Sequence, residues 1–501
     1  MVTGPGSTVE ITLTETVVAT AHYAYVPFDV PVGTTRIDVG MTLDRQASVG
    51  LGLFDPRGAA YQSPGFRGIS GSERRQVFVG LREATPGFLP GPIPPGRWTV
   101  ILPVFLALLP THVTLQIRLT AGADVDSAVT GPLPGVVRSA AGWYRGDLHC
   151  HTEASSDAWS SGTALTPAGY ADLARSLHLD FLAMTDHNVI SQNANLGRDA
   201  GTDVLLLAGE EMTNWFHGHA TISGIEPGVW FDFRQSPFGL PLPTGGRQIE
   251  DLLAAVRAAG GFVSAAHPMV PAMSWQFLTE AFFNSAARTD ALEIWNGRWK
   301  VTDEVSLHVW HRLLCEGWDV VANGGSDLHG TVNDEGLTPG TPTTVVYATA
   351  LAREPIVAAL RAGRSFITRQ PGGVEIYLTA SGPGGQHTFV GGRLRATRGE
   401  FVAVQALVRG AGGMTLTLHT HQGKVLDVVL EGDEQVVDHQ VVMGERDTFV
   451  RAEVRGRASG RGLLPWPNLD MQALTNPIRV TYGTAAEGTL PEHAPPPPTR
   501  V

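Results

Sequence analysis

Histidines and carboxylates recur in short stretches of the central part of the chain, and their types and spacing point to a metal centre. His149 and His151 are two residues apart, so on a strand they point the same way and can bind one ion. Asp327 and His329 repeat this spacing in Gly324-Gly325-Ser326-Asp327-Leu328-His329. Imidazole and carboxylate ligands without a thiolate suit Zn, Mn or Fe.

Three further stretches carry the same residue types. They are Thr185-Asp186-His187-Asn188, Glu210-Glu211-Met212-Thr213 with His219 after it, and Ala265-Ala266-His267-Pro268. Asp157 also follows the first histidine pair closely. Six or more ligands exceed the needs of one ion, so the sequence predicts a multinuclear site. The alternative interpretation is a set of unconnected structural histidines.

Strands and helices must position these residues, and their pattern divides the chain. Alternation of short apolar strands with helical patterns over residues 141–370 predicts an α/β domain with a largely parallel sheet, closed as a barrel. A helix is expected to begin at Thr166-Pro167, with Thr166 as its N-cap, and to run through Leu177. A strand is expected over Phe262–Ala266. The active sites of such barrels gather at the C-terminal ends of the strands.

The residues before and after this central part have the sequence patterns of β-strands. Period-two alternation, as in Val9–Thr14 and Val113–Leu119, predicts an all-β sandwich or jelly-roll domain over residues 1–140. A second β domain is expected over residues 371–485, and the Pro-rich residues 486–501 are expected to be a disordered tail.

Composition excludes several classes of protein. The 501 residues are 43% hydrophobic and 17% charged, as in an ordinary globular protein. The net charge of −12 argues against a nucleic-acid partner. Two cysteines, Cys150 and Cys315, exclude a disulfide framework, and Cys150 is expected to be a small buried hydrophobe. No signal peptide or membrane span is visible, so we expect a cytoplasmic protein with no membrane partner.

The ordered series HxH, TDHN, GEE(M)T…GH, AHP and GSDxH resembles the PHP (polymerase and histidinol phosphatase) superfamily over about residues 141–370. The stretches GDLHCHT, FLAMTDHN, EIWNG and LRAGRSFIT are most similar to its CehA/McbA branch, which includes carbaryl hydrolases. This resemblance implies an α/β fold, a distorted (β/α)7 barrel between the two all-β domains. It also implies two or three divalent metal ions (Mn, Zn or Fe).

The resemblance also implies which residues bind each ion. The three sets are His149, His151, Glu211 and Asp327; Glu211, His219 and His267; and Asp157, His187 and His329. Glu211 is expected to bridge two ions because it directly precedes Met-Thr, and His219 is preferred over His217 because it opens a predicted strand. Asp157 comes six residues after His151 and precedes Ala158, whereas the family commonly has five residues and a Gly, so a two-metal centre is an alternative.

Three more residues are candidates for the catalytic machinery. Asp186 is expected to support the ligands or carry a proton, and capping of the loop after its strand explains it equally well. Arg364 is a candidate clamp for an anionic substrate, or an ordinary surface residue. Asn296 lines the site or makes a turn.

The expected function is a metal-dependent hydrolase, a phosphoesterase using a metal-bridging hydroxide on small phosphate mono- or diesters. The first alternative is a hydrolase of carbamates or aryl esters, favoured by the branch and by tryptophans near the motifs, Trp159, Trp215 and Trp295. The second is a non-catalytic metal-containing binding protein. The expected partner is a small-molecule ester, and the sequence does not indicate an oligomeric state.

Overall fold

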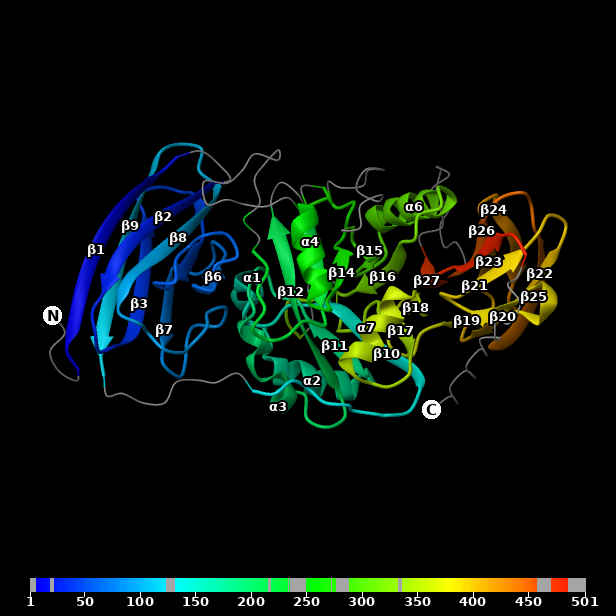
Figure 1. Ribbon diagram of the computed structural model, residues 1–501, viewed down its shortest axis with the longest axis horizontal. Helices are drawn as coiled ribbons and strands as arrows, with labels where there is room; N and C mark the ends of the chain where they lie inside the picture. The colour runs from blue at the N-terminus through cyan, green and yellow to red at the C-terminus, as the bar shows by residue number, and fades with distance from the viewer. Residues whose placement is uncertain are drawn as a thin grey trace.

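Three regions of secondary structure lie in a row along the long axis of the molecule (Figure 1). The computed structural model describes residues 6–18, 22–122, 131–214, 218–232, 234, 249–271, 273–275, 288–331, 336–456 and 470–484. The predicted tail and the candidates Trp215 and His217 lie outside these residues.

The N-terminal region consists of two antiparallel sheets. Its strands are β1 (Thr8–Val17), β2 (His22–Val30), β3 (Thr34–Leu43), β4 (Ser48–Val49), β5 (Leu51–Phe54), β6 (Phe66–Ser70), β7 (Gln76–Gly80), β8 (Gly96–Leu106) and β9 (Thr111–Ala121). One sheet has the order β1-β9-β3-β7, and the other has β2-β8-β5-β6 with β4 beside β8.

The two N-terminal sheets share one apolar core. Alternate residues of β9, such as Leu115 and Ile117, pack in one cluster with Trp98 and Val100 of β8. The period-two pattern of the sequence therefore reflects strands that bury one face and expose the other.

The central region carries the helices. Its elements are β10 (Gly142–Cys150), α1 (Ser156–Ser160), α2 (Pro167–Ser176), β11 (Phe181–Met184), η1 (Ser191–Asn195), α3 (Leu196–Asp199), β12 (Leu205–Asn214), β13 (Gly218–Ser223), α4 (Ile249–Ala258), β14 (Phe262–Ala265), β15 (Ala291–Asn296), α6 (Val301–Cys315), β16 (Val321–Gly325), β17 (Thr343–Ala348), α7 (Arg353–Arg361) and β18 (Ser365–Thr368). The predicted start of α2 is confirmed, because the Thr166 hydroxyl accepts a hydrogen bond from the Gly169 N–H.

The central strands follow the order β16-β15-β14-β13-β12-β11-β10. Neighbours are parallel except at β13, which is antiparallel to both β12 and β14. A parallel connection needs a crossover of a dozen or more residues. Only residues 215–217 separate β12 from β13, so these two strands run in opposite directions, which the expected strand–helix alternation did not anticipate.

The two ends of this run of strands approach each other. Cys150, at the end of β10, makes a parallel bridge with Leu328, which follows β16. The His151 N–H donates to the Leu328 carbonyl and the Asp327 N–H donates to the His149 carbonyl. The histidines after β10 and the acid after β16 are thereby brought side by side.

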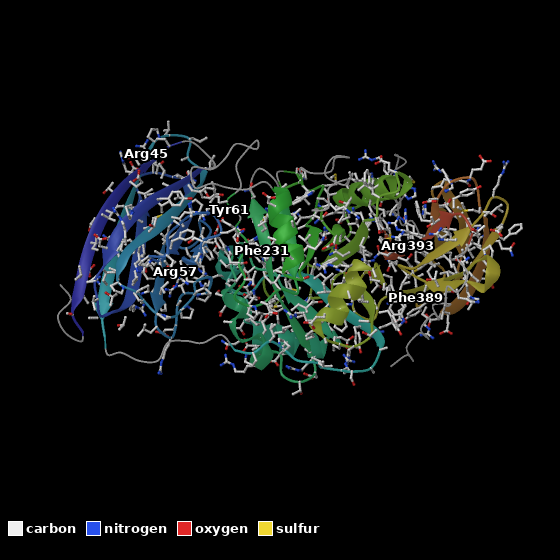
Figure 2. The ribbon with its side chains drawn as sticks, viewed as in Figure 1. Arg45, Arg57, Tyr61, Phe231, Phe389 and Arg393 are labelled. Atoms are coloured by element: carbon white, nitrogen blue, oxygen red, sulfur yellow. The ribbon has the colours of Figure 1, made fainter. Side chains whose placement is uncertain are left out.

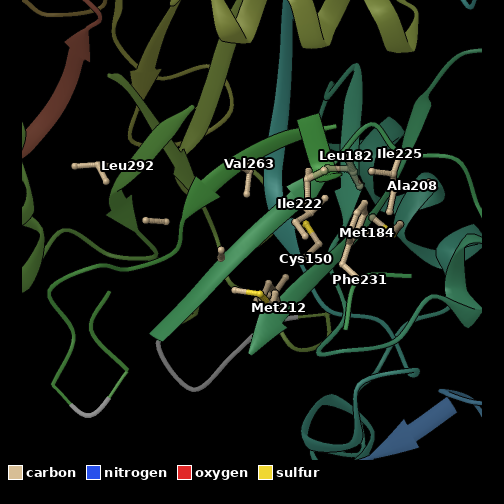
Figure 3. Packing of buried hydrophobic residues seen from close by; sticks show 14 of the residues in the cluster. Cys150, Leu182, Met184, Ala208, Met212, Ile222, Ile225, Phe231, Val263 and Leu292 are labelled. Carbon is tan, nitrogen blue, oxygen red and sulfur yellow. The ribbon is translucent and has the colours of Figure 1, made fainter. Parts of the chain in front are cut away.

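A buried apolar cluster packs around Cys150 at the end of β10. Figure 3 shows Cys150 among Leu182, Met184, Met212 and Ile222, all of which are essentially inaccessible to solvent. The expectation that Cys150 is a small buried hydrophobe is confirmed.

The C-terminal region is again all β, apart from the short turn η3 (Pro383–Gly385). Its strands are β19 (Glu375–Ser381), β20 (His387–Phe389), β21 (Arg393–Ala396), β22 (Phe401–Arg409), β23 (Thr415–Thr420), β24 (Gly423–Val429), β25 (Glu434–Val442), β26 (Thr448–Arg455), β27 (Met471–Thr475) and β28 (Ile478–Tyr482). The central sheet continues into this region because β17 pairs with β10, and β18 pairs with β27. A separate sheet has the order β20-β19-β22-β25.

The molecule as described is therefore mostly β with few helices. None of the helices in the described ranges has both the length and the apolar character of a membrane-spanning segment.

Candidate metal centre

The histidines and acids singled out in the sequence meet at one edge of the central strands. They lie at or just after strand ends, on β12, on β13 or on the short helix α1, and are His149, His151, Asp157, His187, Glu211, His219, His267, Asp327 and His329. The structure brings all nine into one connected cluster through their side-chain contacts.

Glu211 is the hub of this cluster. Its Oε1 lies 3.0 Å from His219 Nδ1, 3.4 Å from His267 Nε2 and 3.5 Å from His149 Nε2. Its Oε2 lies 2.7 Å from His187 Nδ1 and 3.5 Å from His151 Nε2. A fully buried carboxylate between five imidazoles has the position that a bridging ligand needs.

Glu210, the other acid of the pair, occupies the opposite face of β12. Its carboxylate accepts a hydrogen bond from the Phe231 N–H at 3.0 Å. Burial raises the pKa of Glu210 well above its ordinary value, which favours the uncharged form of this side chain. Successive residues of a strand face opposite ways, and only Glu211 faces the histidines.

Two aspartates complete the cluster. Asp327 Oδ1 lies 3.1 Å from His151 Nε2 and 3.4 Å from His149 Nε2. Asp157 Oδ2 lies 3.1 Å from His187 Nε2 and 3.2 Å from His329 Nε2. Asp157 therefore reaches the two histidines assigned to it by the resemblance, although its spacing in the sequence departs from the common pattern.

The donor set suits divalent ions. Three triads have ligand atoms within 4.8 Å of one another, namely His149–His151–Asp327, His187–Glu211–His219 and His151–His187–His329. Among the described residues, the buried Nε2 atoms of His149 and His151 find no partner with hydrogen-bond geometry. Such orphaned atoms are rare in protein interiors, and an ion between them and the carboxylates would satisfy them.

The carboxylates of the cluster are ionised. Burial would raise the pKa of Glu211, but His187, His219 and His149 hold it well below its ordinary value. Burial would also raise the pKa of Asp327, but His149 and His151 hold it well below its ordinary value. Both groups therefore present negative oxygen atoms to a cation.

A second layer of side chains orients the ligands, and the sequence analysis missed its main member. Glu293 on β15 is buried, and its Oε1 lies 3.0 Å from His149 Nδ1. Its Oε2 accepts a hydrogen bond from the His267 N–H at 2.8 Å. The available signal was a lone acid in the apolar strand Ala291–Asn296; its stretch EIWNG had been noted, but only Trp295 and Asn296 were singled out from it.

The three catalytic candidates, Asp186, Arg364 and Asn296, lie at different places relative to the cluster. Asn296 contacts it directly. Its side-chain amide donates to Glu293 Oε2 at 3.1 Å and to Asp327 Oδ2 at 3.2 Å. Asn296 therefore fixes the candidate ligand Asp327 relative to Glu293.

Asp186 lies behind the cluster and supports a loop. Its Oδ1 accepts hydrogen bonds from the N–H groups of Thr152 and Ser155, at 2.7 and 3.0 Å. Burial raises the pKa of Asp186 to about 6. The Ser155 hydroxyl in turn lies 3.1 Å from His151 Nδ1. Asp186 thus holds the loop after β10, rather than the loop after its own strand β11, and this contact agrees with its expected support of the metal-binding candidates.

The structure does not bring Arg364 to the cluster. Its guanidinium lies over the ring of Phe389, 5.5 Å from the centroid, and Phe389 lies among the C-terminal strands in Figure 2. The Arg364 carbonyl accepts a hydrogen bond from the N–H of Tyr347. Tyr347 lies opposite Trp143, near the start of β10, in the pairing of β17 with β10. The histidines lie at the other end of β10, so Arg364 lies away from the cluster in this geometry.

Backbone strain is concentrated at the cluster. Asn188, His267 and Asp327 have positive φ angles of 57°, 28° and 54°. Non-glycine residues rarely adopt such angles, and they persist where surrounding contacts fix them, often at functional sites.

A cavity of about 330 Å³ opens beside the cluster. Asp157, His187 and His219 line it from the central region, and residues of β2, β6 and β8 line it from the N-terminal region. The cluster is thus accessible to a small molecule from the junction of the two regions.

Comparisons with known proteins give little beyond this geometry. No family model matches the chain, and no curated protein matches it. A solved two-domain protein from Bacteroides vulgatus, containing a predicted PHP-like metal-dependent phosphoesterase, is 15% identical, with 71% of this chain and 100% of that chain covered and a TM-score of 0.37. A provisionally assigned metal-dependent phosphoesterase from Bifidobacterium adolescentis is 20% identical, with 39% and 92% covered and a TM-score of 0.28. TM-scores this low add no weight to a fold or a reaction, so the function must follow from the residues of the site.

Proposed function

We propose that this protein is a metal-dependent hydrolase of small esters, and that phosphate esters are its substrates. The observation that carries the proposal is the carboxylate of Glu211, fully buried between five histidines beside a cavity. A binding protein that needs one structural ion has no use for nine candidate ligands, three of which line an open pocket.

We further propose that the centre holds two or three ions, with Mn, Zn or Fe as the candidates. His149, His151, Glu211 and Asp327 would bind the first ion, Glu211, His219 and His267 the second, and Asp157, His187 and His329 the third. The run of strands from β10 to β16, bridged at Cys150 and Leu328, supports the proposal that these strands form the distorted barrel of the PHP superfamily.

Divalent ions in this centre would supply Lewis acidity for the ester oxygens and a nucleophilic water near neutral pH. The residues of the chain contribute positioning. Glu293 and Ser155 fix the rings of His149 and His151, and Asn296 fixes Asp327. Such hydrogen bonds preorganise ligands before substrate binds.

A hydrolase of carbamates or aryl esters is the second candidate, and one observation favours it. No Lys or Arg is among the described residues that line the cavity, and Arg364 lies elsewhere. A substrate with little or no charge needs no cationic side chain, whereas a phosphate monoester would depend on the ions alone for charge neutralisation.

Hydrolysis assays on Mn- and Zn-loaded protein distinguish these functions. The substrates are phenyl phosphate, bis(4-nitrophenyl) phosphate, an aryl carbamate and phenyl acetate. We expect turnover of a phosphate ester by the wild type and a loss of at least 100-fold in Asp327→Asn. Asp319→Asn, at a half-exposed acid paired with Arg393, is the matched control and should retain full activity.

Turnover of the carbamate or acetate alone would replace phosphate esters with the second candidate. Metal-loaded protein that hydrolyses none of the four would contradict both candidates and favour a metal-containing binding protein.

A further inference from the structure

We propose that the N-terminal sheets supply the specificity wall of the active site, against which the apolar organic group of the ester packs. This wall consists of Tyr23, Ile69, Pro103 and Phe105. The inference rests on the proposed function for the reacting group, and it adds the class of organic group and the residues that select it.

The wall and the metal ligands face one cavity from two regions of the chain. Pro103 and Phe105 lie on β8, Ile69 on β6 and Tyr23 on β2, whereas His187, His219 and Asp157 belong to the central region. An ester held at the ligands has the N-terminal residues as the main apolar surface of this cavity, with Ala154 and Met273 of the central region beside them. Apolar surface in contact with the wall is removed from water, which favours binding.

The wall is held in place by polar contacts at the mouth of the site. The Ser156 hydroxyl donates to Glu73 Oε2 at 2.6 Å and accepts from the Gly71 N–H at 2.9 Å. The guanidinium of Arg74, almost fully buried, donates to the Glu153 carbonyl at 2.5 Å. Ser156 directly precedes Asp157, so the same contacts tie the wall to a metal ligand.

A second set of contacts joins the regions away from the mouth. The rings of Phe66 and Trp230 stack with centroids 3.8 Å apart and planes inclined by 3°. Arg234 donates to the carbonyls of Ala59 and Ala60 at 2.9 and 3.0 Å, and Tyr61 lies near Phe231 at this junction in Figure 2. The wall is therefore a preformed surface, which lowers the ordering cost of binding.

Size and charge define the organic group. The cavity of about 330 Å³ lies at the small end of ligand pockets, which span roughly 300–1,000 Å³. The ionisable side chains that line its described part, apart from histidines and Tyr23, are the acids Glu73 and Asp157. Asp157 is a proposed metal ligand, so Glu73 is the acid that repels an anionic organic group, and the wall suits an uncharged group of about one aromatic ring.

The test compares two non-hydrolysable phosphonates that differ only in the organic group. Phenylphosphonate and methylphosphonate are titrated calorimetrically into Mn-loaded wild type, Phe105→Ala and Leu108→Ala. Leu108 lies beyond the end of β8 and is 83% exposed, so Leu108→Ala is the control. We expect the wild type and the control to bind phenylphosphonate about tenfold more tightly than methylphosphonate, and Phe105→Ala to lose most of this preference while its methylphosphonate affinity is unchanged.

An unchanged preference in Phe105→Ala, or equal affinities in the wild type, would overturn the inference and leave the proposed function intact. Binding of neither phosphonate would instead contradict the phosphate-ester proposal. Phenol then tests the wall alone: weaker phenol binding in Phe105→Ala than in Leu108→Ala supports the inference, and equal binding overturns it.

Discussion

At the scale of single residues, the centre depends on an acid that is not among the described residues lining the cavity beside the cluster. The Oε1 atom of Glu293 contacts the ring of His149. Its Oε2 atom accepts hydrogen bonds from the backbone N–H of His267 and from the side-chain amide of Asn296. Acids that hold a ligating histidine fix the orientation of its ring and raise its basicity, and their loss commonly weakens metal binding about 10- to 100-fold.

Glu293→Gln is therefore expected to weaken Zn or Mn binding by about 10- to 100-fold. An amide cannot accept hydrogen bonds at both of its ends, so either His149 or the pair His267 and Asn296 loses its acceptor. Calorimetric titration of the metal into chelator-treated protein measures the effect. Glu226→Gln, at a half-exposed acid paired with Arg353, is the control, and equal affinities in the two variants would remove Glu293 from the centre.

At the scale of elements, the strands β10 and β16 approach each other so closely that β16 has no room for a side chain at its last residue. Gly325 ends β16, and a Cβ atom built there would overlap the Cβ atom of His149 and lie 2.7 Å from Glu293 Oε1. The glycine thus permits the approach that brings His149 next to Asp327.

Gly325→Ala is expected to reduce metal affinity and hydrolytic activity by at least tenfold, because His149 must move to make room. Circular dichroism should show unchanged secondary structure, since the clash is confined to one strand end. Gly228→Ala is the control, because a Cβ atom at Gly228 meets nothing within 4 Å. Full activity in Gly325→Ala would show that His149 is not required where the structure places it.

The sequence predicted the elements and the ligand types better than their connections. Histidines and acids at strand ends were recognisable because the same types recur at each predicted exit. Glu293 was missed because a lone acid in an apolar strand has no local pattern, and its role arises only when β15 lies beside His149. The position of Arg364 could not be predicted from its local motif, because it depends on the pairing of the adjacent strand β18 with β27.

At the scale of the whole molecule, buried charges join the central and C-terminal regions. Glu453 on β26 accepts from Arg451 and, at 3.0 Å, from Arg455. Arg455 also donates to Glu304 on α6 at 3.0 Å. This network links the helix beside β15 to the C-terminal sheet, so its charge state affects the stability of the whole chain.

Glu453 gives this junction a defined response to acid. Burial would raise the pKa of Glu453, but Arg451, His419 and Arg455 lower it from 4.5 to about 2. Because the folded pKa lies below the unfolded one, the ionised group stabilises the fold above pH 4.5, and this contribution is lost as the pH falls toward 2. The shift corresponds to roughly 3 kcal/mol.

Glu453→Gln should therefore lower the free energy of unfolding by about 3 kcal/mol at pH 7, and the difference from the wild type should shrink as the pH falls from 4.5 toward 2. Urea unfolding of metal-free protein at pH 7, 4 and 3 measures both values without interference from metal loss. Glu445→Gln removes an exposed acid paired with Arg398 and should change stability by less than about 0.5 kcal/mol at every pH. A difference for Glu453→Gln that stays constant down to pH 3 would mean that Arg451 and Arg455 do not hold this carboxylate ionised, and the junction would then depend on its apolar contacts instead.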